Sequence, residues 1–264
     1  MLYDKALTIQ FLQKNVEIIM AKPSIEHWQT EIVRFSLMTK EPFSEKIEEW
    51  WKALTGSPPE EVTTRPIAGF KSVSSMIDDY VLELRTQFNR VDIIASPNPS
   101  ISKELLSLGA AETSNEMICR RVAEWVEHSA HLPIIRLAFL PTFFRPVENT
   151  EYANSIISSY LGIPEECLRE AKDLALQANF QKKSAAVENT VINRIAKFSS
   201  PIAQIMSIGD GIPVPQIHER HLCRAEIDIN TDVDRTDGFT PREQAVVLRE
   251  LITSAETLIS KGWL

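Results

Sequence analysis

The feature that most constrains the fold is an order of patterns that occurs twice in the chain. In the first half, residues 31–38 (EIVRFSLM) alternate between apolar and polar side chains, which is typical of a half-buried strand. Residues 43–54 then have apolar side chains at helical spacing and are followed by Gly56 and two prolines. Residues 80–88 and 90–96 again read as strands. The order is therefore strand, helix, strand, strand.

The same order returns in the second half. Residues 134–139, 174–180 and 191–198 predict strands, and residues 153–161 predict a helix that ends at Gly162. We therefore predict an internal duplication with two copies.

Short matching sequences and helix-capping motifs in the two halves support this duplication. The dipeptide Asn-Arg is followed by Ser-Pro at identical spacing from Asn89 and from Asn193. Each unit continues to a helix that a T-x-x-E capping box would begin, at Thr113 and at Thr240. In such a box the Thr hydroxyl and the Glu carboxylate satisfy free backbone N–H groups. The second helix is predicted to end at Gly262.

These patterns predict an α+β protein of two tandem strand-helix-strand-strand-helix units with antiparallel sheets, related by a pseudo-twofold axis. Residues 1–30 form an N-terminal segment whose spacing fits either a helix or a pair of strands. Residues 31–132 form the first unit and residues 133–264 the second. An insert near 202–238 is expected to add an extra strand pair to the second unit.

Charge and composition exclude several classes of protein. The 264 residues contain 28 Lys and Arg against 36 Asp and Glu, a net charge of −8. A general nucleic-acid binder or a binder of anionic membranes needs a basic surface, so neither is expected. Only 8 glycines are present, and no glycine-rich phosphate loop or nucleophile-elbow motif occurs. A nucleotide-dependent enzyme is therefore disfavoured, and no cofactor is assigned.

The cysteines and the apolar stretches indicate the compartment. Cys119, Cys167 and Cys223 are far apart and form no C-x-x-C pair, which favours a reducing environment. The N-terminal residues are a poor signal peptide, and no apolar stretch is long enough to span a bilayer. We expect a soluble, cytoplasmic protein.

Two kinds of side chain are candidates for contact with a ligand or partner. Trp50 and Trp51 are adjacent, so on a helix they point about 100° apart, and one can pack in the core while the other faces a pocket or a partner. Tyr160 lies near the corresponding place in the second unit. Arg90 and Arg194 both follow Asn in the duplicated spelling, and they could bind an anion or fix a turn. Core packing is the alternative role for the three aromatic residues.

Metal and carboxylate patterns are less specific. His218, His221 and Cys223 offer three ligands within six residues, but no second cluster completes a zinc site, so a polar connection entering a strand is the preferred interpretation. In residues 226–234 carboxylates alternate with apolar side chains, which predicts a solvated strand face or an edge protected by charge. No catalytic residue is assigned.

Two resemblances follow from these patterns. The stretches INRI (192–195) and AEIDI (225–229), followed by a long terminal helix, resemble an uncharacterised, sporadically distributed prokaryotic protein family, which implies no known activity. The tandem units are similar in topology to the gyrase-inhibitor-like effector-binding fold. That similarity implies a ligand cleft between two units and assigns no residue.

The leading hypothesis is a non-catalytic binding, sensor or regulatory protein that uses an inter-repeat cleft or a sheet face for a small molecule or a protein partner. One alternative is a metal- or carboxylate-dependent enzyme with its site in the 202–238 insert. Another is a subunit of a larger prokaryotic assembly, such as a defence-associated one, anchored by Trp51 or Trp263. The patterns do not favour an enzyme and leave the oligomeric state open.

Overall fold

The structure, a computed structural model, describes residues 23–42, 47–99, 105–129, 132–207, 216–235 and 237–262. Its first half contains two α-helices, a 3-10 helix and five strands: β1 (Gln29–Thr39), α2 (Ile47–Thr55), β2 (Glu61–Arg65), η1 (Pro66–Ala68), β3 (Phe70–Ile77), β4 (Tyr80–Gln87), β5 (Arg90–Pro97) and α3 (Ala111–Ser129).

The second half repeats this order of strand, helix, four strands and helix: β6 (Ile134–Val147), α4 (Thr150–Leu161), η2 (Glu165–Cys167), β7 (Ala175–Lys183), β8 (Val191–Ser199), β9 (Ile202–Ser207), β10 (Gln216–Thr231) and α5 (Pro241–Lys261). The α+β class predicted from the sequence is confirmed.

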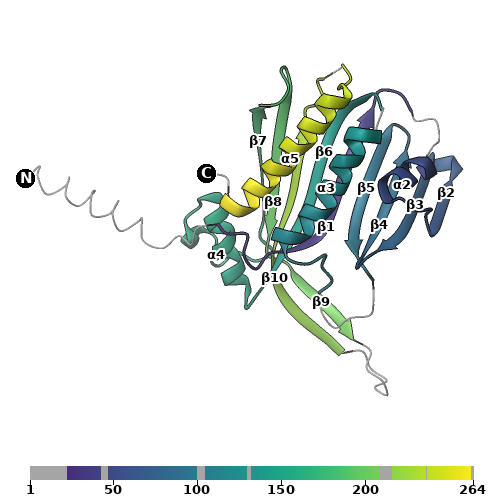
Figure 1. The fold of residues 1–264 in the computed structure, drawn as a ribbon. Helices are drawn as coiled ribbons and strands as arrows, with labels where there is room; N and C mark the ends of the chain where they lie inside the picture. Colours follow the sequence, from purple (N-terminus) through teal and green to yellow (C-terminus); the bar gives the residue numbers. More distant parts are fainter. Residues whose placement is uncertain are drawn as a thin grey trace, which may run out of the picture.

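The strands of both halves form one continuous antiparallel sheet (Figure 1). Its order is β2-β3-β4-β5-β1-β6-β10-β8-β7, and β9 pairs with β10 beside this path. The first strands of the two halves, β1 and β6, pair with each other, and Phe35 lies directly opposite Phe139. The prediction of a separate sheet in each unit is therefore wrong, and the boundary between the halves is a strand pair rather than a cleft.

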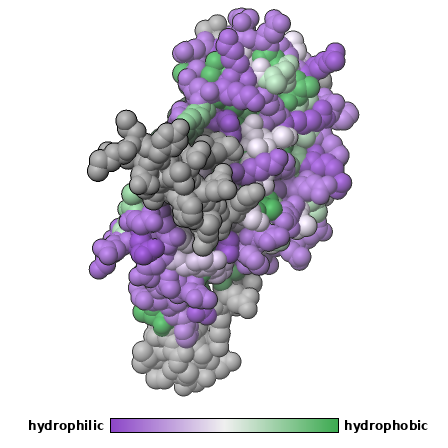
Figure 2. Space-filling model, turned by 90° about the vertical axis from the view of Figure 1, so that its left-hand side faces the viewer, coloured by the Kyte–Doolittle hydropathy of each residue, from purple (hydrophilic) through white to green (hydrophobic). Residues whose placement is uncertain are grey.

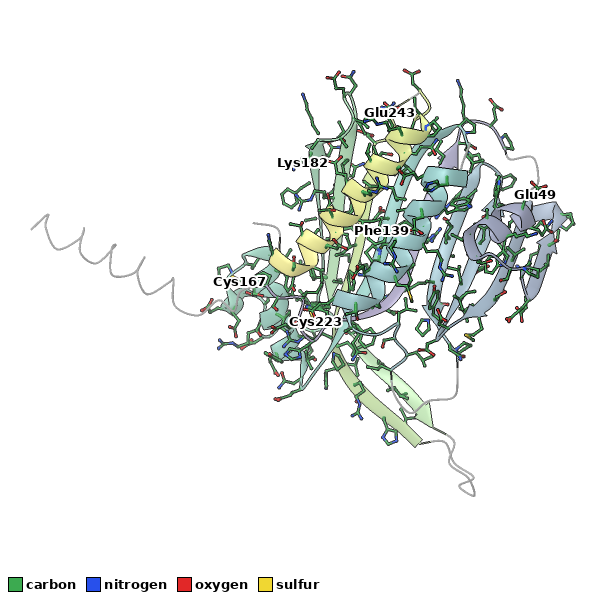
Figure 3. The ribbon with its side chains drawn as sticks, viewed as in Figure 1. Glu49, Phe139, Cys167, Lys182, Cys223 and Glu243 are labelled. Carbon is green, nitrogen blue, oxygen red and sulfur yellow. The ribbon has the colours of Figure 1, made fainter. Side chains whose placement is uncertain are left out.

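The helices lie on one face of this sheet. Helix α5 contacts β6, β10 and β8, α3 contacts β1, and α2 contacts β3 and β4. Helix α4 reaches the same layer, because Tyr160 on α4 packs against Phe198 of β8 and its hydroxyl bonds to Ile259 of α5. The core fills the space between, and Phe139 is fully buried midway across the sheet (Figure 3).

Helices α3 and α5 each bury one apolar face. The apolar side chains of α3 (Ile118, Val122, Trp125) and of α5 (Ala245, Leu248, Ile252, Ala255, Ile259) are all buried. The capping box at Thr240 and Glu243 is also confirmed, with Pro241 at the first helical position.

The capping box at Thr113 is wrong. Helix α3 begins two residues earlier, at Ala111, and the Thr113 hydroxyl lies 3.4 Å from the carbonyl oxygen of Ala110. The start of α3 is set instead by the residue before β1, because the N–H of Ala111 donates to the carbonyl of Trp28 at 2.9 Å.

Strands β2 and β3 were not predicted. All five residues of β2 are exposed. Because neither face of this strand is buried, its sequence EVTTR does not alternate between apolar and polar residues. Strand β3 (FKSVSSMI) contains three serines, which hide its period. The first half therefore has as many strands as the second.

The strand pair predicted in residues 202–238 is present as β9 and β10, but it is not extra to the second half, because both halves have five strands. The N-terminal part of β10 pairs only with β9, and this hairpin projects beyond the rest of the sheet (Figure 1). From Arg224 to Thr231, β10 lies between β6 and β8. Glu226 and Asp228 are therefore partly exposed on an interior strand, so of the two predicted alternatives the solvated strand face is confirmed and the charged edge is wrong. Asp232 and Asp234 follow the end of β10.

No helix among the described residues is long and apolar enough to cross a membrane. The ambiguous pattern at the N-terminus falls on residues 1–22, outside the described residues.

We predict that the β1–β6 pair makes the two halves unfold together. Phe139 is fully buried and its ring centroid lies 4.8 Å from that of Phe35. Replacing it with Ala (Phe139→Ala) should lower the free energy of unfolding by about 3–5 kcal/mol. Urea unfolding should remain a single transition. The control is Phe180→Ala on β7, where the side chain is 54% exposed and the loss should be under ~1 kcal/mol. Two separate transitions would contradict the prediction.

A second prediction concerns pH. Partial burial and, to a lesser degree, the charge of Glu116 on α3 raise the pKa of Glu256 on α5 above 4.5, although much of the residue is exposed. A raised carboxyl pKa favours the folded state below pH 4.5, and this contribution is lost as the pH rises through the folded value. Glu256→Gln should therefore raise Tm by roughly 1–2 °C at pH 7. At pH 4 the two proteins should melt together, and an equal gain at both pH values would contradict this cause.

Candidate functional site

Alternate residues of each strand point away from the helices and form a second face of the sheet. On β1, Val33, Phe35 and Leu37 point toward the helices and are buried, whereas Arg34 and Met38 point the other way and are partly exposed. Among the described residues, no helix packs on this second face. We call it the open face.

The open face is mainly polar. The strand register places these side chains on it, in order from β3 to β7: Ser72, Ser74, Glu83, Arg85, Arg90, Asp92, Arg34, Ser36, Arg136, Thr142, Arg224, Glu226, Asp228, Asn230, Asn193, Lys197 and Gln177. Hydrophilic residues also dominate the flank of the molecule, where hydrophobic ones form only small patches (Figure 2).

A hollow of about 410 Å³ lies on one half of the open face, from the middle strand β1 to the edge strand β7, over β1, β6, β10, β8 and β7. Its apolar lining is Ile32, Leu140 and Ile195. Its polar lining is Arg34, Thr142, Gln177, Lys197, Glu226 and Asp228. Strands β1, β6, β10 and β8 are paired on both sides, so their backbone groups are engaged in the sheet. Any ligand in the hollow is therefore recognised by side chains.

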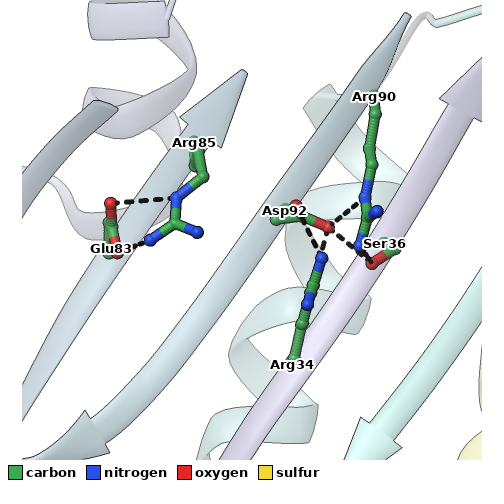
Figure 4. A network of polar contacts seen from close by, with 6 residues as sticks. All are labelled: Arg34, Ser36, Glu83, Arg85, Arg90 and Asp92. Atoms are coloured by element: carbon green, nitrogen blue, oxygen red, sulfur yellow. Dashed lines mark hydrogen bonds and ion pairs between the residues drawn. The ribbon is translucent and has the colours of Figure 1, made fainter. Parts of the chain in front are cut away.

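Arg34 is held by a buried carboxylate. Asp92 on β5 is 5% exposed and accepts hydrogen bonds from Arg34 Nε (3.3 Å) and Nη2 (3.0 Å). It also accepts from Arg90 Nε (2.8 Å) and from Ser36 Oγ (2.5 Å). Figure 4 shows the two guanidinium groups on either side of this carboxylate. One anion serves two cations, so this cluster, Arg34–Asp92–Arg90, carries one unit of excess positive charge.

The other side of the hollow contains a chain of ion pairs. Arg224 contacts Glu31 (Nε to Oε2, 2.7 Å) and Glu226 (Nη1 to Oε1, 2.7 Å). Lys197 Nζ lies 3.0 Å from the same Oε1 of Glu226. Two cations and two anions make this chain neutral.

Asp228 stands apart from these pairs. It accepts a hydrogen bond from Asn230 Nδ2 at 2.8 Å, and no cation of the described residues forms an ion pair with it. Asn230 Oδ1 in turn accepts from Arg136 Nη2 at 3.0 Å, so the charge of Arg136 reaches Asp228 only through a neutral amide. The hollow thus has excess positive charge on its Arg34 side and excess negative charge at Asp228.

The two tryptophans divide as their spacing predicted. Trp51 is fully buried in the core, which removes it as an anchor for a partner. Trp50 is partly buried and lines a pocket of about 330 Å³ on the helix side, together with Ile47 and Phe88. Trp263, the other predicted anchor, lies outside the described residues.

Tyr160 has a structural position and not a ligand-facing one. It is 1% exposed, packs edge-on against Trp28, and its hydroxyl lies 2.6 Å from Ile259 O and 2.8 Å from Ser24 O. Burial raises the pKa of this phenol, which keeps it a neutral hydrogen-bond donor. Its role is to join α4 to α5 and to the segment before β1.

Arg90 and Arg194 are not at corresponding places. Arg90 begins β5, next to β1, and lies on the open face. Arg194 lies on β8, separated from β6 by β10, and faces the helices beside Arg249 and Glu250. The shared Asn-Arg sequence was misleading. Strand β5 pairs with β1, the first strand of its half, and the strand in the same position in the second half is β10, which pairs with β6.

The candidate metal ligands do not converge. His218 and His221 point to opposite faces of β10, and His221 Nδ1 lies 3.1 Å from Thr150 Oγ1. Cys223 is fully buried, and burial raises the pKa of its thiol to about 12, so it is not a thiolate at neutral pH. No group of three potential ligands is present among the residues that the structure describes.

Sequence motifs did not identify the residues of the hollow. Ile32 and Arg34 come from β1, Leu140 from β6, and Ile195 from β8, so no single local motif contains all of them. The available signal was the alternation itself, which marks the polar side of each strand but not which strands are neighbours.

The comparisons with known proteins add no family. No family model matches the chain, and neither the curated proteins nor the solved structures give a match. The resemblance to an uncharacterised prokaryotic family stays a prediction.

We predict that Asp92 is needed for stability because it neutralises two arginines. Asp92→Asn should lower the free energy of unfolding by about 2–4 kcal/mol in urea, since it leaves Arg34 and Arg90 without their counter-ion. The matched control is Glu83→Gln on the neighbouring strand, whose pair with Arg85 (2.7 Å) is more exposed. That change should cost under about 1 kcal/mol. Equal losses would show that the Asp92 cluster is an ordinary surface ion pair.

Proposed function

We propose that this chain is a non-catalytic binding protein whose ligand is a small organic molecule held in the hollow on the open face. The observation that supports this most directly is an apolar floor of Ile32, Leu140 and Ile195 surrounded by fixed charged groups. Small-molecule sites commonly combine an apolar lining with a few placed polar groups, and a volume of roughly 300–1,000 Å³ is typical.

The energetic argument concerns the three apolar side chains. All three are partly exposed on a face that is mainly polar. A ligand that covers them gains about 25 cal/mol for each Å² of apolar surface removed from water. Arg34, Lys197 and Glu226 are already held in ion pairs, so little of their side-chain freedom is lost on binding.

The same geometry favours the sheet face over the other sites considered from the sequence. Because β1 and β6 pair directly, they leave no cleft between the two halves. The carboxylates proposed for an enzyme in the 202–238 insert include Glu226, which is bound by both Lys197 and Arg224. A carboxylate held in place by two cations suits the orientation of a ligand.

We predict that small ligands perturb the floor of the hollow. The test is a methyl-labelled NMR titration of the full chain with a fragment library of neutral, charged and zwitterionic members. Fragments that bind should shift the methyl signals of Ile32, Leu140 and Ile195, while Ile47 beside the Trp50 pocket should not move. Hits that shift Ile47 alone, or a library that leaves the three floor residues unmoved, would refute the proposal.

A variant sharpens this test. Leu140→Gln replaces one floor residue with a polar one of similar size, and the side chain is only partly buried, so the fold should be retained. The affinity of floor-binding fragments should fall at least ~10-fold, because the lost contact and the newly unpaired amide together cost more than about 1.4 kcal/mol. The control is Val81→Gln, a partly buried apolar residue on the open face that does not line the hollow.

A further inference from the structure

The hollow carries two opposite unbalanced charges, and their placement restricts the ligand that fits. The positive one belongs to the Arg34–Asp92–Arg90 cluster, and the negative one is Asp228. The ion pairs among Glu31, Arg224, Glu226 and Lys197 cancel one another. A ligand with a single charge would satisfy one end of the hollow and leave the other end uncompensated.

The two charges lie in one row across the sheet. Arg34 is directly opposite Leu140 on β6, and the register of β6 with β10 places Leu140 opposite Asp228. Strands lie about 4.8 Å apart, so the backbones of Arg34 and Asp228 are separated by about 10 Å. No ion pair joins the two side chains, since Arg34 leans toward Asp92 on β5.

We propose that the hollow binds a short peptide with free termini and apolar side chains, of dipeptide length. This inference rests on the binding function proposed above. The carboxylate of the peptide would accept hydrogen bonds from Arg34, and its ammonium group would donate to Asp228. The apolar side chains of the peptide would cover Ile32, Leu140 and Ile195.

The span of the row selects the length of the ligand. An extended chain covers about 3.3–3.6 Å per residue, so the termini of a dipeptide lie roughly 7 Å apart. One hydrogen bond of about 2.8 Å at each end then bridges roughly 12 Å. A free amino acid is too short to reach both charged groups at once.

The remaining polar lining suits the peptide bond. Thr142 and Gln177 line the hollow, and neither side chain makes a hydrogen bond within the part of the chain that the structure describes. A hydroxyl and an amide can each donate or accept, which matches the N–H and C=O of one peptide group. The engaged strand backbones leave this task to side chains.

The first test uses four matched probes on the unmodified chain: leucyl-leucine, N-acetyl-leucyl-leucine, leucyl-leucinamide and leucine. Each is titrated into the methyl-labelled protein. Leucyl-leucine should shift the signals of Ile32, Leu140 and Ile195 and bind tightest. Removing the ammonium charge, removing the carboxylate charge, or shortening the ligand should each weaken binding at least about 10-fold.

Variants then assign each charge to its residue. Arg34→Gln should abolish the preference for leucyl-leucine over leucyl-leucinamide, and Asp228→Asn should abolish the preference over the N-acetyl peptide. The controls Arg65→Gln and Glu61→Gln remove the same charges from β2, at the edge of the sheet, and should leave both preferences unchanged. Thermal melting of each variant checks that it is folded, and the probe series on the unmodified chain stands independently of this check.

The outcomes separate this inference from the proposed function. If neutral or singly charged fragments shift the floor methyl groups but leucyl-leucine does not, the hollow is a binding site and the peptide assignment is overturned. Equal binding by leucyl-leucine and its N-acetyl form, or by leucine, would also overturn it. If no probe shifts the floor residues, both the inference and the proposed function fail.

Discussion

The pairing of β1 with β6 is the interaction on which the rest of the structure depends. It joins two halves with the same order of elements into one sheet, with Phe35 and Phe139 in contact at the joint. Because the helices of both halves lie on the same side of that sheet, the core is shared and the opposite side stays uncovered within the described residues. Two separate units would have met at a cleft, whereas a continuous sheet offers its face instead.

An uncovered sheet face must be stable in water without a second layer. This chain achieves it with polar side chains that are paired along and across the strands, such as Glu83 with Arg85 and Lys197 with Glu226. Unlike these pairs, which solvent screens, Asp92 is only 5% exposed, and two arginines share it. Its burial makes the positions of Arg34 and Arg90 part of the fold rather than a property of flexible surface side chains.

Local features were predictable from the sequence because their causes are local. The capping box at Thr240 and the stripes of α3 and α5 depend on residues within a few positions of one another. The start of α3 was mispredicted because it is fixed by the carbonyl of Trp28, far away in the chain. The pairing of β1 with β6 was also not predictable. Residues 31–38 and 134–139 were both recognised as strands, but alternation states which side of a strand is apolar and not which strand lies beside it.

The candidate site shows the same limit in a sharper form. The sequence suggested ligands in clusters such as His218, His221 and Cys223, but His218 lies on the opposite face of β10 from the other two, and His221 contacts Thr150. The residues that do converge are the polar positions of strands that the sequence assigns only to solvent: Arg34 of β1, Asp92 of β5 and Asp228 of β10. Each looks like an ordinary surface charge in its own strand. The strand order places a positive and a negative group on either side of Leu140. A ligand with two charged ends can therefore lie across the strands, with one end at each group.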